Sequence, residues 1–324
     1  MADQTPVPDH VVEIRDFTLD FPHLYGRIGL VRGVDLDIAR GECVGLVGES
    51  GSGKTLLGLS IVGLQPPSAT VSGSLRVCGR DVLKQGEKAW RSMRGRQVAM
   101  IYQDALVSLN PGLRVRKQLE QALRHEPSRT PEELLEAVQI RDVARCLGSY
   151  PHELSGGQRQ RVLIALAISA RPEIIVADEP TTALDVTVQA QVMTLLDDLR
   201  REFGFGLLFI SHDLGLVSTV ADRVAVMYAG EIVEVGATSR VLGEPRHPYT
   251  RGLLDSSWSL QAGAERLSQI PGVVPAPSDF LDACRFSPRC SRADDLCRTE
   301  RPRAESGAAC HHPVQSVPLT KVSR

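Results

Sequence analysis

The sequence predicts an α/β fold in which a largely parallel, doubly wound sheet carries helices on both faces. Two observations lead to this prediction. Short apolar runs typical of buried strands alternate along the chain with longer segments of helical periodicity. Polar side chains follow directly after several of these runs, and in such sheets ligands bind at the carboxyl ends of the strands. At 324 residues, the chain can hold one main domain and an additional segment.

The N-terminal part predicts three strands and a helix. Residues 11–21 alternate loosely and predict an edge strand, and residues 30–38 alternate again. The continuous apolar run at residues 43–47 predicts a buried strand. Residues 56–62 predict the helix that follows. The connection between this buried strand and this helix is the most informative stretch of the sequence.

That connection, residues 48–55, reads Gly-Glu-Ser-Gly-Ser-Gly-Lys-Thr. Glycines let successive backbone N–H groups face an anion, and the helix adds its free N-terminal N–H groups. Lys54 is placed to reach the β- and γ-phosphates, and the Thr55 hydroxyl is placed to ligate Mg²⁺. A glycine-rich turn with a surface lysine would not need this full pattern between strand and helix, so the sequence predicts a nucleoside triphosphate site. Its phosphate-binding residues are Gly48, Ser50, Gly51, Ser52, Gly53, Lys54 and Thr55.

The middle of the chain predicts a helical insert between strands of the sheet. A strand near residues 73–77 is followed by a polar stretch to Arg96 and by a short buried strand at residues 97–102. The pattern is helical from 104 to about 151. Residues 130–133 (Thr-Pro-Glu-Glu) predict a helix start with a capping box.

The remaining elements complete the predicted sheet. The motif LSGGQ at residues 154–158 opens a strong helix that runs through Ala170. Residues 174–179 form a continuous apolar strand that ends in two carboxylates, and residues 206–210 form the next buried strand. Residues 187–203 predict the amphipathic helix between them. A hairpin about Ala229-Gly230 is expected to close the sheet.

Four polar side chains follow predicted strands. Asp178 and Glu179 end a strand that we expect beside the phosphate-loop strand, and Gln103 and His212 follow two other strands. Asp178 suits the Mg²⁺ shell together with Thr55, and Glu179 suits a general base or a water-positioning group. His212 can hydrogen-bond the γ-phosphate or the attacking water, and Gln103 can reach Mg²⁺ or water. A lone histidine or glutamine at a strand end is best explained by loop packing, but the four groups together indicate phosphoanhydride hydrolysis.

In this order, the motifs resemble those of an ABC-transporter ATPase. The resemblance runs from about residue 11 to 240 and implies a P-loop NTPase (RecA-like) core with an antiparallel β subdomain and an α-helical insert at about 104–160. An irregular, cysteine-containing C-terminal appendage at 241–324 would follow. The matching motifs are Walker A (48–55), the Q-loop (Gln103), the signature (154–158), Walker B (174–179), the D-loop (182–185) and the switch histidine (His212).

Within that family, three further stretches resemble the dipeptide/oligopeptide importer ATPases, which are close to the nickel-importer ATPases. They are YPHELS at 150–155, TTALDVTVQAQ at 181–191 and HPYT at 247–250. The threonine-rich stretch looks like the D-type member of two paired ATPases. The resemblance implies import of di- or oligopeptides through a membrane permease. Nickel or another solute is one alternative, and a non-transport ABC ATPase is the alternative from another class.

The resemblance also implies a composite site and a set of partners. ATP would lie between Walker A of one subunit and the signature of a second ATPase subunit, with Phe21 or Tyr25 stacking on the adenine; we expect Phe21. Two membrane permease subunits and, indirectly, an extracytoplasmic substrate-binding protein would complete the transporter, with this chain peripheral on the cytoplasmic face. The residues expected on the second side of the nucleotide or in the D-loop are Ser155, Gly156, Gly157, Gln158 and Asp185.

Composition agrees with a globular protein and gives no sign of nucleic-acid binding. Hydrophobic residues make up 42% of the chain, charged residues 23% and aromatic residues 4%, and the formal net charge is −2. No apolar stretch approaches the roughly 18–20 residues of a membrane span. Met1 to His10 does not resemble a signal peptide. We therefore expect a cytoplasmic protein with cysteines that are thiols or metal ligands.

Four of the seven cysteines fall in the final 41 residues, with the spacing C-x5-C-x6-C-x12-C. Their surroundings, which include Arg285 and Arg289, look too polar for a small core. Four thiolates suit tetrahedral Zn²⁺ or a [4Fe–4S] cluster, although zinc sites more often contain short C-x2–4-C pairs. The importer ATPases that this tail resembles can carry a [4Fe–4S] cluster there, which implies such a cluster with a structural or redox-sensing role. Zinc or unrelated thiols remain the alternatives; the residues concerned are Cys284, Cys290, Cys297 and Cys310.

Overall fold

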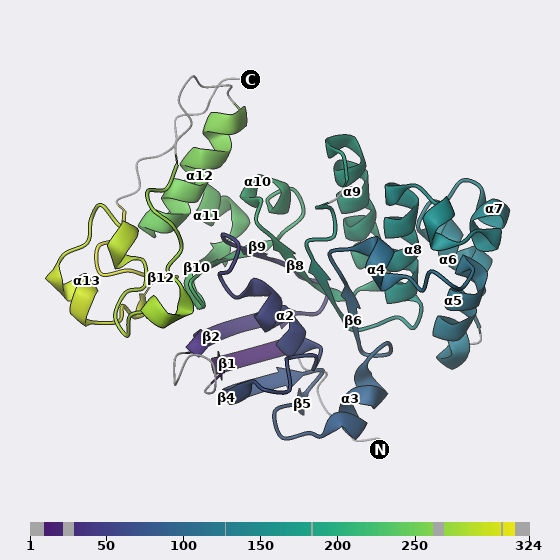
Figure 1. Cartoon of the computed structure of the whole chain (residues 1–324), viewed down its shortest axis with the longest axis horizontal. Coiled ribbons are helices and arrows are strands. Elements are labelled where there is room, and N and C mark those ends of the chain that lie inside the picture. The colour runs from purple at the N-terminus through teal and green to yellow at the C-terminus, as the bar shows by residue number, and fades with distance from the viewer. Residues whose placement is uncertain are drawn as a thin grey trace, which may run out of the picture.

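The structure is a computed structural model that describes residues 10–21, 29–126, 128–182, 184–261, 269–305 and 307–314. Within these residues the strands form two sheets (Figure 1). One sheet has four strands in the order β2-β1-β4-β5, and the other has eight in the order β11-β12-β10-β9-β3-β8-β7-β6.

The four-stranded sheet is the antiparallel subdomain. Its strands are β1 (His10–Asp20), β2 (Gly29–Ala39), β4 (Thr70–Val77) and β5 (Arg80–Asp81). The prediction that the first strand lies at an edge is wrong, because β1 pairs with β2 on one side and with β4 on the other. Loose alternation reports which face of a strand is buried, whereas the number of neighbours is set by pairing with distant segments.

The eight-stranded sheet contains the parallel core, as predicted. Its strands are β3 (Cys43–Val47), β6 (Val98–Ile101), β7 (Ile174–Asp178), β8 (Gly206–Ser211), β9 (Arg223–Tyr228), β10 (Glu231–Ala237), β11 (Ala304–Glu305) and β12 (Ala308–Ala309). β8 pairs with β3 and with β7, so the strand that carries the two carboxylates does not lie beside the phosphate-loop strand. That expectation is wrong because β8, which comes later in the chain, inserts between the two.

The helices cover the sheets and form the insert. Their bounds are α2 (Lys54–Ile61), α3 (Glu87–Met93), α4 (Ala105–Ser108), α5 (Val115–Ala122), α6 (Pro131–Ala137), α7 (Val143–Gly148), α8 (Gly156–Ile168), α9 (Val186–Phe203), α10 (Leu214–Val217), α11 (Thr238–Gly243), α12 (Pro248–Gln261) and α13 (Asp295–Thr299). Helices α4 to α8 gather beyond β6, on the right in Figure 1. In the part of the chain that the structure describes, no helix is long and apolar enough to cross a membrane.

Local sequence signals set several helix ends. At α6, Thr130 and Glu133 form the predicted capping box, and at α8, Ser155 and Gln158 form a second one. Gly204 ends α9 with φ 70°, a left-handed conformation that costs glycine little. Helix α3 was missed by the sequence analysis, although Trp90 and Met93, three residues apart, are both buried.

The chain beyond residue 240 packs onto the large sheet. β12 pairs with β10, so the hairpin does not close the sheet as expected. Tyr249 and Phe286 are buried, and their rings lie 4.7 and 5.1 Å from the ring of Tyr228 at the end of β9. Arg285, one of the polar residues around the cysteines, is only 3% exposed, whereas Ser291 and Arg292 are exposed. The two terminal nitrogens of Arg285 donate to the backbone carbonyls of Ala229 and Gly29, which compensates part of the cost of burying the charge.

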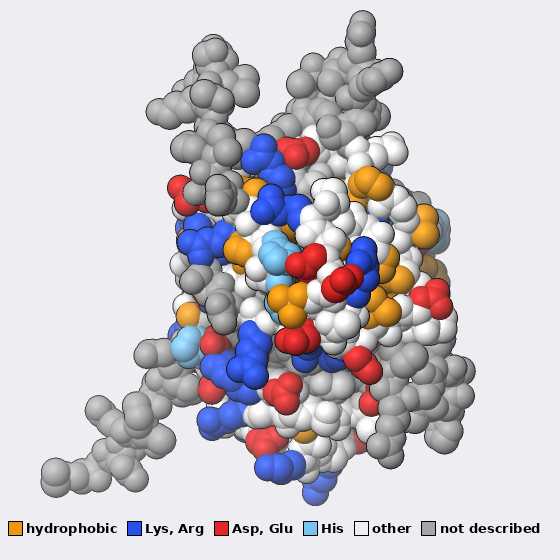
Figure 2. All heavy atoms as spheres, turned by 90° about the vertical axis from the view of Figure 1, so that its left-hand side faces the viewer, with side chains coloured by type: hydrophobic (Ala, Val, Ile, Leu, Met, Phe, Trp, Pro, Cys, Tyr) orange, Lys and Arg blue, Asp and Glu red, His pale blue; other side chains and the backbone are white. Residues whose placement is uncertain are grey.

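Figure 2 looks onto the side of the molecule where this C-terminal extension lies. Over the described part of that face, basic and acidic side chains are interspersed, with histidine among them. Such a mixed surface gives this face no continuous basic track for a nucleic-acid backbone.

His247, at the start of the extension, yields a prediction on pH. Burial lowers the pKa of His247 from its ordinary 6.5 to about 3, and its Nδ1 accepts the backbone N–H of Tyr249. Between about pH 3 and pH 6.5, the unfolded chain therefore binds a proton at this residue that the folded chain does not bind. Because of this difference, the free energy of unfolding rises with pH over this range. In His247→Asn, whose amide oxygen can replace Nδ1 as acceptor, the slope of unfolding free energy against pH should fall by up to about 1.4 kcal/mol per pH unit.

The measurement is urea unfolding of both proteins between pH 4 and pH 6.5. His152→Asn is the matched control, because that side chain is exposed and its loss should leave the slope unchanged. Equal slopes in the wild type and in His247→Asn would contradict the prediction.

Candidate functional site

The phosphate loop borders a hollow of about 740 Å³ at the carboxyl ends of the parallel strands. The structure brings Gln103, Glu179 and His212 to this hollow beside Lys54 and Thr55, although these residues come from widely separated parts of the sequence. The lining residues are Leu30, Glu49, Ser50, Gly51, Ser52, Gly53, Lys54, Thr55, Leu56, Gln103, Glu179, His212, Leu253, Pro277 and Phe280.

The phosphate loop is folded tightly against the turn between β9 and β10. Gly48 has φ 157°, and a Cβ atom there would lie 2.1 Å from the carbonyl oxygen of Met227, so only glycine fits. Further along the loop, the backbone N–H of Gly230 donates to the carbonyl of Ser52 at 2.8 Å. Strand β3 enters the loop and α2 leaves it, as the sequence predicts.

Lys54 is buried beneath the loop, with 5% of its surface exposed. Its Nζ donates to the carbonyl oxygens of Gly48 and Glu49 at 2.8 and 2.9 Å. Burial lowers the pKa of Lys54, and the nearby carboxylates of Glu179 and Asp178 oppose that shift. The ammonium group is therefore held by the loop carbonyls, and the oxygen atoms of a bound phosphate would be further acceptors for its N–H groups.

Thr55 and Asp178 meet even though β8 separates β7 from β3, the strand that leads into the phosphate loop. The Thr55 hydroxyl donates to Asp178 Oδ1 at 3.3 Å, and Asp178 ends β7 with 6% exposure. Burial raises the pKa of the Asp178 carboxyl. A hydroxyl and a carboxylate this close offer two oxygen ligands of the kind that Mg²⁺ takes beside a triphosphate.

Three strand ends converge on the Glu179 carboxylate. His212 Nδ1, after β8, lies 3.2 Å from Oε1, and Gln103 Nε2, after β6, donates to Oε2 at 3.3 Å. The Thr182 hydroxyl also donates to Oε2, at 2.9 Å. Glu179 itself has φ 45°, a left-handed conformation rare outside glycine, which is typical of strained functional positions. This arrangement can orient a water molecule or accept its proton.

The sequence analysis missed Thr182 as a partner of Glu179. The only available signal was its position three residues after Glu179, where a turn brings the two together. Leu253 of α12 and, further along the extension, Pro277 and Phe280 were missed as lining residues, since nothing local in the sequence indicates which cavity a distant segment will border.

The signature residues do not line the phosphate-loop hollow. Ser155, Gly157 and Gln158 line a separate hollow of about 880 Å³, which they share with α9. Ser155 caps the N-terminus of α8, and Asp185 caps the N-terminus of α9 by accepting the N–H of Val188. A 13-residue helix whose first turn faces this hollow presents N–H groups that an anion from another molecule can use.

The structure places Phe21 away from the hollow. It lies at the end of β1, is 8% exposed, and packs in the core of the antiparallel sheet rather than among the lining residues. Its expected stacking on adenine stays a prediction. Tyr25, the alternative, lies outside the described residues.

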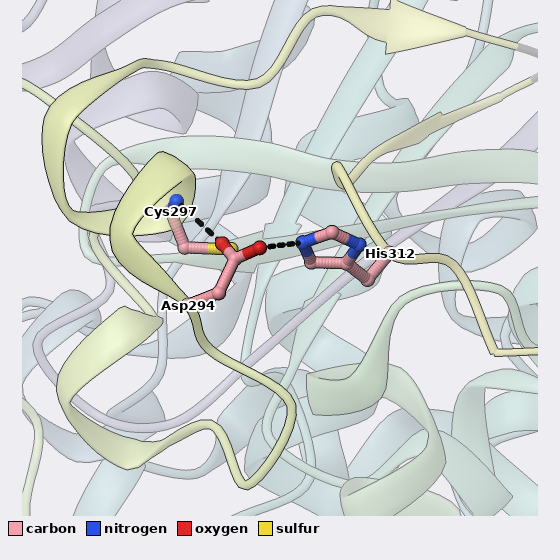
Figure 3. A group of neighbouring side chains, drawn as sticks. All are labelled: Asp294, Cys297 and His312. Atoms are coloured by element: carbon pink, nitrogen blue, oxygen red, sulfur yellow. Dashed lines mark hydrogen bonds and ion pairs between the residues drawn. The ribbon is translucent and has the colours of Figure 1, made fainter.

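The four C-terminal cysteines line one small hollow, together with Arg292, His311 and His312 among others. Among the described residues, the one group of three possible metal ligands with all ligand atoms within 4.8 Å is Asp294, Cys297 and His312. In Figure 3 the Asp294 carboxylate lies between the other two: it accepts the N–H of Cys297 at 3.1 Å and contacts His312 Nε2 at 2.8 Å.

Comparison with known proteins gives two matches to family models. Residues 31–182 match the family described as ABC transporter, and residues 233–297 match the oligopeptide/dipeptide transporter C-terminal region. The second match covers the segment that holds His247, Tyr249 and three of the four cysteines of the small hollow.

Relatives match over nearly the whole chain. A putative peptide import ATP-binding protein of Brucella melitensis is 45% identical over 90% of both chains. The probable D,D-dipeptide transport ATP-binding protein DdpD of Escherichia coli is 43% identical over 95% of this chain and 98% of its own. Among solved structures, a dimeric bacterial ABC transporter cassette is 26% identical with a TM-score of 0.62, covering 70% of this chain and 98% of its own.

The site geometry predicts different defects for two substitutions. Glu179→Gln keeps the shape of the side chain but removes its charge and basicity, so hydrolysis should slow by roughly 10²–10⁴-fold while ATP still binds. Lys54→Ala removes a phosphate partner, so ATP binding itself should weaken. Phosphate release and equilibrium binding of a fluorescent ATP analogue separate the two effects. Wild-type turnover in Glu179→Gln would contradict the role of Glu179.

Proposed function

The chain belongs to the ABC transporter ATPases, in the branch of the dipeptide and oligopeptide importers, and we propose that its ATP hydrolysis drives peptide uptake through a membrane permease. The observation that carries this proposal is the order of the two matched segments. A nucleotide-binding cassette is followed by the C-terminal region particular to oligopeptide and dipeptide transporters. The relatives that cover 90% or more of this chain include proteins named for peptide import.

We propose that the working unit is a heterodimer with a second ATPase subunit, docked on two permease subunits at the cytoplasmic face of the membrane. An extracytoplasmic binding protein would deliver the solute to the permease. The separation of Ser155 and Gly157 from the phosphate-loop hollow supports this arrangement, since one chain leaves its signature anion site unused. ATP bound between two subunits would stabilise their closed state, and hydrolysis would release it.

Transport coupling can be tested by reconstitution. We expect weak ATPase activity from the isolated chain and higher activity once the second ATPase and the permease subunits are present in proteoliposomes. Peptide-loaded binding protein should raise it further, and a complex carrying Glu179→Gln is the control for activity from contaminants. Full activity from the chain alone, or stimulation by DNA instead of by permease, would contradict the proposal. Stimulation by a nickel-loaded binding protein only would replace peptide with nickel as the solute.

We also propose that the cysteine hollow holds a [4Fe–4S] cluster through Cys284, Cys290, Cys297 and Cys310. All four side chains line this one hollow. The cysteines are separated by long spacings in the sequence and lack the short C-x2–4-C pairs that zinc sites more often contain. This spacing favours the bulkier cluster. When bound, such a cluster would supply a cross-link between chain segments or a one-electron redox centre.

The test is metal and sulfide analysis of full-length protein purified without oxygen. We expect a brown protein with about four iron and four sulfide per chain. Cys290→Ser should remove the colour and the iron. Cys146→Ser, which changes a buried cysteine in the helical insert, is the matched control and should keep both. A colourless protein with one zinc per chain would contradict the cluster and favour a zinc site.

A further inference from the structure

The C-terminal extension forms an ion pair with the phosphate loop itself. Both terminal nitrogens of Arg289 donate to the Glu49 carboxylate, at 2.6 and 3.1 Å. The Arg289 side chain is 4% exposed and that of Glu49 is 31% exposed. Arg289 Nε donates in addition to the carbonyl of Pro271, so the guanidinium is fixed from two sides. These two residues are 240 positions apart in the sequence, yet they form a bidentate pair.

Further contacts hold the same part of the loop. The Tyr249 hydroxyl accepts the backbone N–H of Glu49 at 2.8 Å, and the carbonyl of Glu49 accepts from Lys54 Nζ at 2.9 Å. Arg285 donates to the carbonyl of Ala229, in the turn that bonds to the loop. The side chain and the N–H of Glu49 are therefore both held by the extension.

The position of Glu49 allows the ion pair with Arg289 to affect phosphate binding. Glu49 lines the hollow that Lys54 and Thr55 border, so its carboxylate lies at the wall of an anion site. An unpaired carboxylate there would repel the phosphates of ATP, and protein on one side of this partly exposed group would reduce the screening by water. A fully paired carboxylate does not oppose an anion in this way.

We propose that Arg289 is a positioning residue for ATP binding: it neutralises Glu49 and holds it against the C-terminal extension, so that the phosphate loop accepts the triphosphate. The extension thereby sets the affinity of the nucleotide site within its own chain. This inference rests on the ATP site and is independent of the solute transported. It is also independent of what the cysteine hollow binds.

The experiment measures the dissociation constant for a fluorescent ATP analogue with the full-length chain. Arg289→Gln leaves Glu49 unpaired and should weaken binding about tenfold, the size expected for loss of a charged hydrogen-bonded pair. Arg289→Lys keeps the charge but loses the bidentate geometry, so it should lie between Arg289→Gln and the wild type. Arg298→Gln is the matched control, because it removes an exposed arginine whose ion pair among the described residues is with Asp295 of the same extension. It should bind as the wild type does.

The double variant Arg289→Gln/Glu49→Gln separates this role from a purely structural one. With the carboxylate also removed, no charge opposes the phosphates, and affinity should return to within about threefold of the wild type. A structural role would make the double variant bind as poorly as Arg289→Gln or worse.

Two outcomes would overturn the proposal. One is an unchanged dissociation constant in Arg289→Gln. The other is failure of Glu49→Gln to restore binding in the double variant. If Arg289→Gln does not fold, Arg289→Lys and its double variant with Glu49→Gln supply the same comparison.

Discussion

The buried ammonium group of Lys54 is the constraint on which the rest of the structure depends. A cation with 5% exposure must be surrounded by oxygen atoms, and here the loop's own carbonyls supply them. They can do so only if the backbone folds back sharply, which requires glycine at position 48 and support from outside the loop. Strand β3, helix α2, the turn after β9 and the C-terminal extension each provide part of that support.

The second requirement is that polar groups from different strands reach the same point. Parallel strands deliver their carboxyl ends to one edge, so Gln103, Glu179 and His212 need no long loops to meet. Because β8 inserts between β3 and β7, His212 comes within 3.2 Å of Glu179, while Asp178 still reaches Thr55. The order of the strands thus places Asp178 beside Thr55, where the pair could ligate Mg²⁺, and Glu179 beside His212, where it could orient a water molecule.

The C-terminal extension lies between two possible centres of chemistry. Residues 284–290 carry two cysteines of the small hollow, and the same short segment carries Arg285 and Arg289, which reach the β9–β10 turn and the phosphate loop. A buried aromatic cluster formed with Tyr228 and Tyr249 fixes this segment to the sheet. Rigid packing of this kind transmits a displacement on one side to the other, because close-packed interiors have little free volume.

The sequence by itself determined several features that depend on neighbours in the chain. The glycine loop between strand and helix, the capping box at Thr130 and the polar residues after the buried strands follow from local spacing and backbone chemistry. What the tertiary structure decided is the order of strands in each sheet, the burial of Phe21 and Arg285, and the pairing of Arg289 with Glu49. These depend on contacts between segments as much as 256 residues apart, for which local periodicity carries no information.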